Sequence, residues 1–121
     1  MGRVLLNLIN NAFYAVNQRK QLLNDESYTP SVSVTTQQFD NQIIIKVRDN
    51  GIGMSEATKA KVFQPFFTTK PTGQGTGLGL SLAYDIVTKG HGGTIEVNSK
   101  EGVGTTFIIK LPLQKIIKNV K

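Results

Sequence analysis

Three segments of this chain carry residues whose types and spacing could do chemistry. Asn7 and Asn11 lie one helical turn apart, Asp49 begins the run Asp-Asn-Gly-Ile-Gly, and residues 73–81 read GQGTGLGLS. An amide oxygen is a hard, neutral ligand that suits Mg²⁺, and a buried carboxylate needs strong hydrogen-bond donors. A glycine-rich run that leads into a helix is an anion site, because unpaired amides and the positive helix end point the same way. Together these segments indicate a site for a phosphorylated ligand.

Each segment also has a plainer interpretation. The asparagine pair is expected on the helix face opposite the apolar one, and that position is typical of a solvated polar face. Asp-Asn-Gly is a common turn, and glycines form flexible linkers. The linker is disfavoured because the run ends at a helix with apolar periodicity. Two familiar phosphate patterns are excluded, since the chain has no Gly-Lys pair and glycines 73, 75, 77 and 79 do not match Gly-x-Gly-x-x-Gly.

The position of Asp49 favours a binding role for its carboxylate. The segment 42–49, QIIIKVRD, alternates as a strand, so Asp49 shares the face of three apolar residues: Ile43, Ile45 and Val47. An adenine presents an amino group that a single acceptor can read. Gly51 and Gly53 would let the backbone approach such a base without interference from a Cβ.

The apolar pattern predicts two helices, two strand pairs and a long loop. We expect a helix over 3–21 and an antiparallel hairpin that turns at Asp40 and Asn41. The half-buried first strand of this hairpin carries Val32 and Val34. Ser55 should cap a short helix that ends near residue 62, before a mobile loop over 64–79. The second half should hold a helix over 78–89 with a left-handed cap at Gly90 and strands over 94–99 and 105–111.

The expected inward-facing residues of the two long helices follow the same periodicity. They are Val4, Leu5, Leu8, Ile9, Ala12, Phe13, Val16, Leu82, Ile86 and Val87. The fold class predicted is α+β, with helices covering one face of a mainly antiparallel sheet.

Composition narrows the function further. The chain has 121 residues, 39% of them apolar, which suits one domain, and it shows neither a membrane span nor a secretory signal. It has no cysteine and one histidine, His91, which excludes a thiolate site or a multi-histidine metal centre within it. The net charge is +6, but the basic residues are scattered, so nucleic-acid binding is disfavoured.

The motifs, taken in order, resemble the catalytic ATP-binding domain of two-component sensor histidine kinases. The N box of that family is similar to NLINNA (7–12), and its G1 box is similar to DNGIGM (49–54). Its F box is similar to VFQPFFTTK (62–70), and its G2 box is similar to GTGLGLS (75–81). A closing strand motif is similar to EGVGTTFIIKLP (101–112). The match spans about residues 4–112, and ordered motifs are more specific than any single one.

The resemblance implies the Bergerat ATP-binding fold: an α/β sandwich, helices on one face of a mixed, mainly antiparallel sheet, and a long ATP lid. Residues 1–112 would form the domain and residues 113–121 a basic tail. Asp49 would accept from the adenine amino group, Asn11 would ligate Mg²⁺, and Asn7 would orient the phosphates or the nucleophile. Lys70 could reach the γ-phosphate. The remaining implied contacts are Gly51, Gly53 and Thr105 around the adenine and Gly75, Gly77, Leu78, Gly79 and Leu80 at the phosphates.

The implied reaction is transfer of the γ-phosphoryl group of Mg-ATP to a histidine on separate dimerisation helices, upstream of a response regulator in the cytoplasm. The related ATPases have a glutamate where this chain has Asn7, and an amide cannot take up a proton from water, so hydrolysis should be slow. His91 follows a helix end and is not expected to be the acceptor. Phe63, Phe66 and Phe67 fit either core packing or a latch for the lid.

Two further interpretations stay open: a serine protein kinase of the anti-sigma type, and a nucleotide-binding module without catalysis. The serine kinase is disfavoured because it needs a carboxylate base. The acceptor helices and a strand of the family's longer domain are missing, so we expect a fragment that does not label itself and whose exposed sheet edge favours self-association. The sequence leaves open whether the parent protein is anchored in a membrane.

Overall fold

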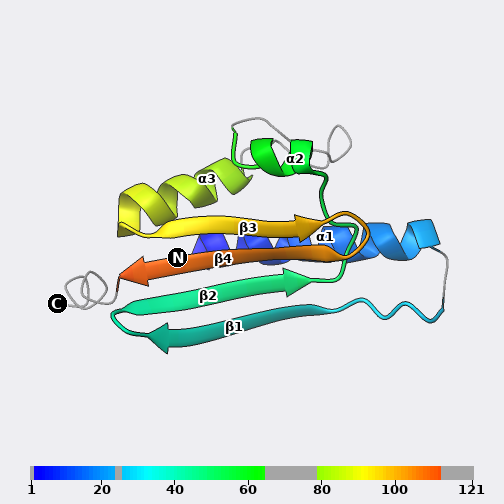
Figure 1. The fold of residues 1–121 in the computed structure, drawn as a ribbon, viewed down its shortest axis with the longest axis horizontal. Coiled ribbons are helices and arrows are strands. Elements are labelled where there is room, and N and C mark those ends of the chain that lie inside the picture. The colour runs from blue at the N-terminus through cyan, green and yellow to red at the C-terminus, as the bar shows by residue number, and fades with distance from the viewer. Residues whose placement is uncertain (1, 24–25, 65–78, 113–121) are drawn as a thin grey trace.

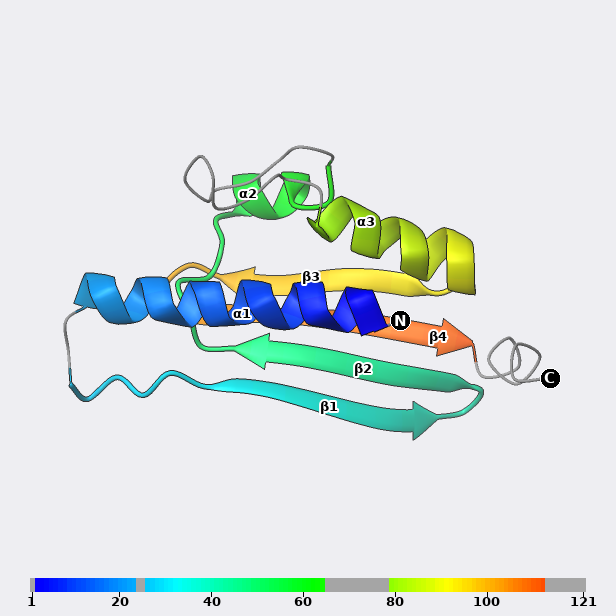
Figure 2. The same cartoon turned by 180° about the vertical axis from the view of Figure 1, so that it is seen from behind.

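The structure is a computed structural model that describes residues 2–23, 26–64 and 79–112. Its elements, labelled in Figure 1, are α1 Gly2–Leu23, β1 Val32–Phe39, β2 Gln42–Asp49, α2 Glu56–Lys61, α3 Gly79–Asp85, the π-helical turn η1 Ile86–Gly90, β3 Thr94–Lys100 and β4 Gly104–Pro112. The four strands form one sheet in the order β1-β2-β4-β3, and all three pairings are antiparallel. The helices cover one face of it, as Figure 2 shows from behind. The predicted α+β class is confirmed, but no parallel pairing occurs in the described part of the sheet.

The first helix is held to the sheet by a narrow apolar stripe. Val4, Leu8, Ala12 and Val16 recur every fourth residue and are at most 6% exposed. Phe13 was expected on this face but is 57% exposed. At about 100° per residue it points some 120° away from the centre of the stripe. The helix confirms the predicted span to within two residues. Leu5 and Ile9 pack partly buried against the core as expected, so Phe13 is the residue that departs from the predicted face.

The core lies between this stripe and the inner face of the three strands β2, β4 and β3. Its sheet side consists of Ile45, Val47, Ile95, Phe107, Ile109 and Leu111. The prediction that β1 is half-buried was wrong at Val34, which is 44% exposed, because α1 packs beside β1 rather than over it. The strand β1 is therefore an exposed edge in the described structure.

The second long helix differs from the prediction in three details. Ala83 and Val87 are its buried residues, whereas Leu82, expected inward, is 40% exposed. The helix passes through Gly90 in a wider π-helical turn, and the left-handed residue is Gly92, with a φ of +64°. The Gly93 amide then donates to the Val87 carbonyl oxygen at 2.9 Å, which closes the helix end.

The predicted hairpin turn, the bounds of the second strand and the cap of the short helix are confirmed. The hairpin turns at Asp40, whose φ is +54°, and β2 has the predicted bounds. Ser55 caps α2 by accepting from the Thr58 amide at 3.2 Å. The predicted loop over 64–79 and the tail after residue 112 lie outside the described residues, except at Gln64 and Gly79. In the part of the chain that the structure describes, every helix is too short or too polar to span a bilayer.

Candidate functional site

Asp49 is the centre of the candidate site. It is the last residue of β2, lies opposite Thr105 of β4, and is 6% exposed. Burial raises the pKa of its carboxyl group, while hydrogen bonds from the backbone of Gly51 and Thr105 act in the opposite direction. The ion pairs found among the described residues, Lys59–Glu56 and Lys89–Asp85, lie elsewhere. The Asp49 carboxylate is therefore a buried acceptor held by amide donors.

The turn after Asp49 is pressed against two other segments. The Gly51 amide donates to the Asp49 Oδ1 atom at 2.8 Å. A Cβ on Gly51 would lie 2.5 Å from the carbonyl carbon of Ala15 in α1. Gly53 has a φ of +70°, and a Cβ there would collide with the Lys100 carbonyl oxygen. Both glycines are thus required for packing, and their role beside a base stays a prediction.

Arg19 and Tyr28, which no sequence motif indicated, donate hydrogen bonds to this turn. Arg19 donates through Nη1 to the carbonyl oxygens of Asn50, Gly51 and Val103, at 3.0, 3.3 and 3.2 Å. The Tyr28 hydroxyl donates to the Asn50 carbonyl oxygen at 2.8 Å, and its ring centroid lies 4.9 Å from the Arg19 guanidinium carbon. The partners of Arg19 are 31, 32 and 84 residues away, so no local pattern indicates them.

The Asn50 side chain ties the same turn to the segment before β1. Its amide group donates to the Thr29 carbonyl oxygen at 2.8 Å, and its Oδ1 atom accepts from the Ser31 amide at 2.8 Å. The Asp-Asn-Gly turn is therefore fixed by its side chains as well as by its backbone. The turn held in this way includes the Gly51 amide that donates to the Asp49 carboxylate.

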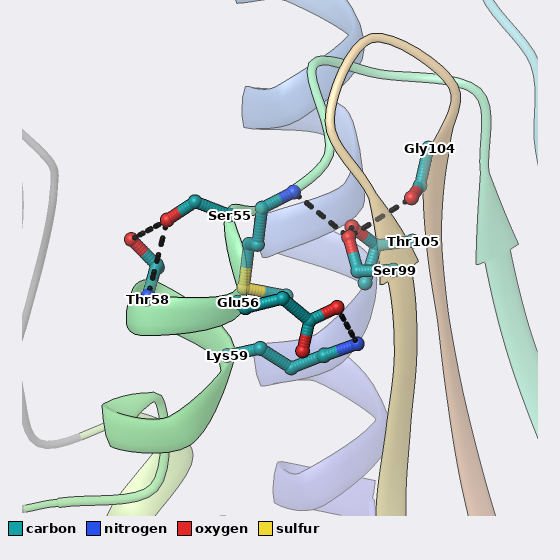
Figure 3. A network of polar contacts seen from close by, with 8 residues as sticks. Ser55, Glu56, Thr58, Lys59, Ser99, Gly104 and Thr105 are labelled. Atoms are coloured by element: carbon teal, nitrogen blue, oxygen red, sulfur yellow. Dashed lines mark hydrogen bonds and ion pairs between the residues drawn. The ribbon is translucent and has the colours of Figure 1, made fainter.

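A hydroxyl network, drawn in Figure 3, joins Ser99 of β3 to Thr105 of β4. Thr105 is the residue that pairs with Asp49 of β2. Ser99 of β3 accepts from the Met54 amide at 2.8 Å and contacts the Gly104 carbonyl oxygen at 3.0 Å and the Thr105 hydroxyl at 2.8 Å. The single proton of Ser99 points to the Gly104 oxygen, which can only accept. Thr105 must then donate to Ser99, which leaves the Thr105 oxygen as an acceptor.

The other predicted site residues lie on the helices. Asn7 and Asn11 are partly buried on α1 and flank its apolar stripe, so the expectation that they lie opposite it was wrong. Gly79 begins α3, and Leu80 packs partly buried against the core. The helices α1 and α3 contact each other, so the helix that carries both asparagines packs against α3.

The F-box and G2-box residues are only partly described. Phe63 packs on Tyr84 and Phe107, with ring centroids 5.4 and 6.1 Å away, which is a core-packing role. Phe66, Phe67, Lys70, Gly75, Gly77 and Leu78 lie outside the described residues.

Comparison with known proteins gives consistent matches. The family model described as histidine kinase-, DNA gyrase B-, and HSP90-like ATPase matches residues 1–115. The chain is 40% identical over 113 residues to the sensor histidine kinase ZraS of Escherichia coli K12, covering 93% of this chain and 22% of that protein. It is 39% identical over 114 residues to the histidine-protein kinase AtoS of the same organism, covering 93% and 17%. The chain thus spans about a fifth of these relatives.

Solved structures show the same likeness. The catalytic domain of the histidine kinase ThkA matches with a TM-score of 0.71 and 35% identity, over 93% of this chain and 66% of that one. The mycobacterial sensor histidine kinase MprB matches with a TM-score of 0.72 and 29% identity, over 92% and 68%.

Proposed function

Because the chain belongs to the histidine kinase-, DNA gyrase B- and HSP90-like ATPase family, we propose that it binds Mg-ATP and passes the γ-phosphoryl group to a histidine on the dimerisation helices of its parent protein. The matched relatives are named sensor histidine kinases, which supports this reaction over the hydrolysis of the gyrase and chaperone branches. The downstream partner would be a response regulator. The setting would be the cytoplasm, and no nucleic acid is expected to bind.

The observation that carries the proposal is the environment of Asp49. An ionised carboxylate only accepts hydrogen bonds, and the adenine amino group only donates them. At 6% exposure the carboxylate is shielded from water, so a bond to it counts for more than on the surface. A purine with a keto oxygen at the same position would meet the carboxylate acceptor to acceptor. The site is therefore suited to adenine.

The phosphates would lie toward the helices. Asn11 offers one amide oxygen, and Mg²⁺ prefers oxygen ligands together with waters and nucleotide phosphates. Within residues 2–23, 26–64 and 79–112, no group of three His, Cys, Asp or Glu side chains is placed to hold a metal. Asn11 thus fits an ion that arrives with the nucleotide. The N-terminus of α3, with Gly79 and Leu80, would face the phosphates, completed by Gly75, Gly77, Leu78 and Lys70.

Asn7 supports transfer to a histidine. A neutral imidazole nitrogen has a lone pair and needs no base, whereas water or a serine hydroxyl must lose a proton. The Asn7 amide cannot accept that proton. Its proposed role is to orient the phosphates or the incoming imidazole, so that catalysis rests on positioning and charge stabilisation.

Calorimetric titration with Mg-ATP tests the binding proposal. Asp49→Asn should weaken ATP binding by about 10- to 150-fold, the worth of a hydrogen bond to a charged group. Asn11→Ala should remove mainly the Mg²⁺-dependent part of the affinity, and Asn10→Ala, an exposed neighbour on the same helix, should change neither. Unchanged ATP affinity in Asp49→Asn would overturn the assignment.

Radiolabelled ATP tests the reaction. The chain alone should take up no phosphate, and label should appear on separately supplied dimerisation helices of the parent protein. Label on His91 would contradict the proposal, as would label on a serine of the partner. The exposed edge strand β1 also favours association of two chains, and a monomeric mass at high concentration would refute that association.

A further inference from the structure

We propose that Arg19 is a positioning residue for adenine recognition, acting on the Asp49 carboxylate through the peptide group between Asn50 and Gly51. This inference rests on the proposed function, because it assigns Arg19 to the same site. Arg19 lies on α1, in none of the motif segments that resemble the family boxes.

The argument begins with one planar peptide unit. The Asn50 carbonyl and the Gly51 amide belong to the same peptide, so their bond directions are locked together. The carbonyl oxygen accepts from Arg19 at 3.0 Å, and the amide donates to the Asp49 Oδ1 atom at 2.8 Å. The positive guanidinium and the negative carboxylate are therefore joined through a single rigid group.

Two effects follow from this arrangement. A rotation of the peptide that broke the bond to Asp49 would also break the bond to Arg19, so Arg19 resists it. The guanidinium also polarises the carbonyl, which strengthens the amide as a donor to the carboxylate. Arg19 thereby orients and stabilises a charged group that it does not touch in the structure.

Tyr28 acts on the same oxygen. Its hydroxyl donates to the Asn50 carbonyl at 2.8 Å, and its ring lies against the Arg19 guanidinium, whose carbon is 4.9 Å from the ring centroid. The Tyr28 hydroxyl is protonated at neutral pH, because its ordinary pKa of 10.0 already lies well above 7 and burial raises that pKa further. The carbonyl is thus held by a charged donor and a neutral donor that also brace each other.

Arg19 also donates hydrogen bonds to two further carbonyl oxygens. It donates to Gly51 at 3.3 Å and to Val103 at 3.2 Å, which fixes the turn between β3 and β4 beside the turn after Asp49. Lysine keeps the charge and the donating nitrogen but lacks the planar guanidinium that stacks on Tyr28. Arg19→Lys is therefore an informative conservative change.

The test compares ATP with inosine triphosphate, which has a keto oxygen where ATP has the amino group. The variants are Arg19→Met, Arg19→Lys and Tyr28→Phe. The control is Arg48→Met, which removes an equal charge from the exposed opposite side of β2, next to Asp49. Each protein is titrated calorimetrically with both nucleotides, and its folded state is checked by circular dichroism.

We expect Arg19→Met to weaken ATP binding about tenfold and to leave inosine triphosphate binding within about twofold, since one charge-assisted interaction behind the carboxylate is lost. Arg19→Lys and Tyr28→Phe should lower the ATP preference less, and Arg48→Met should leave it unchanged. If Arg19→Met does not fold, those two milder variants decide the question.

Two outcomes would refute different claims. If the wild-type chain binds both nucleotides equally, the proposed adenine role of Asp49 fails. If the wild type prefers ATP and the Arg19 and Tyr28 variants keep that preference while both affinities fall together, Arg19 merely stabilises the fold. In that case the positioning role is refuted and the proposed function stands.

Discussion

Acidification should act on Asp49 in two opposite ways, one on folding and one on ligand binding. Its ordinary pKa of 3.8 is raised in the folded chain, chiefly by burial. Between 3.8 and the raised value the folded chain binds more protons than the unfolded chain. The stability that Asp49 contributes is therefore fully present below pH 3.8 and is lost as the pH rises through the folded pKa.

The affinity for ATP should change with pH in the opposite direction to the stability. A protonated carboxyl group presents a hydrogen to the adenine amino group and loses its charge, so ATP affinity should fall as the pH drops through the folded pKa. The 6% exposure of Asp49 leaves little solvent to screen the interaction. The full loss should therefore reach the worth of a hydrogen bond to a charged group, about 10- to 150-fold.

The effect of Asp49 ionisation on the free energy of unfolding is of comparable size to its effect on ATP binding. Each pH unit by which the folded pKa exceeds the unfolded one costs the ionised folded chain about 1.4 kcal/mol. In Asp49→Asn, which does not titrate, this pH dependence should disappear. The unfolding free energy of the wild type minus that of Asp49→Asn should thus decrease as the pH rises from 3.8 through the folded pKa, and the total decrease should equal that cost.

Urea unfolding and Mg-ATP titration of both proteins over this pH range measure the two effects. Subtracting the Asp49→Asn curves removes the protonation of the nucleotide phosphates and of the other side chains. Opposite slopes in the two difference curves are the expected result. A flat or rising stability difference would show that Asp49 is ionised without cost, and the argument from burial would then be wrong.

Three further changes have defined outcomes. Gly51→Ala should destabilise the chain by about 1–3 kcal/mol in urea unfolding, because its Cβ would lie 2.5 Å from Ala15, and a loss under about 0.5 kcal/mol would contradict this close packing. Ser99→Ala should lower the free energy of unfolding by about 1 kcal/mol and should weaken ATP binding, because the Thr105 hydroxyl loses its partner. Unchanged ATP affinity would show that this hydroxyl network plays no part in nucleotide binding. Asn7→Glu should raise ATP hydrolysis, measured as phosphate release, by about 100-fold if a base is what Asn7 lacks, and no rise would refute that interpretation.

Local signals predicted the strands well because strand alternation is strict. Asp49 occurs in phase with the buried Val47, so strand alternation correctly placed both on one face. Alternation does not show which face is covered, because Val34 of β1 was expected to be half-buried and is exposed. The cap at Ser55 and the turn at Asp40 depend only on neighbouring residues, and both were predicted correctly. These features involve hydrogen bonds and side-chain directions within a few residues.

The helices were predicted less well because a helix has several possible apolar faces. Leu82 and Ala83 are about 100° apart, and the sequence favours burying the larger one, yet Ala83 is buried and Leu82 is 40% exposed. The helix α3 contacts α1, and helical periodicity alone does not include that tertiary contact. Gly90 was chosen as the cap from composition, but the wider turn of η1 moved the left-handed position to Gly92.

The hydrogen bonds to the Asn50 carbonyl oxygen show why Arg19 and Tyr28 could not be predicted from the sequence. Asp49 and Gly51 are adjacent to it and belong to a motif, whereas Arg19 reaches it across 31 residues and Tyr28 across 22. An arginine on a polar helix face has no pattern that separates a solvated charge from a structural one. The motif therefore contains the group proposed to bind the ligand, and the tertiary fold supplies the distant donors that hold the turn beside it.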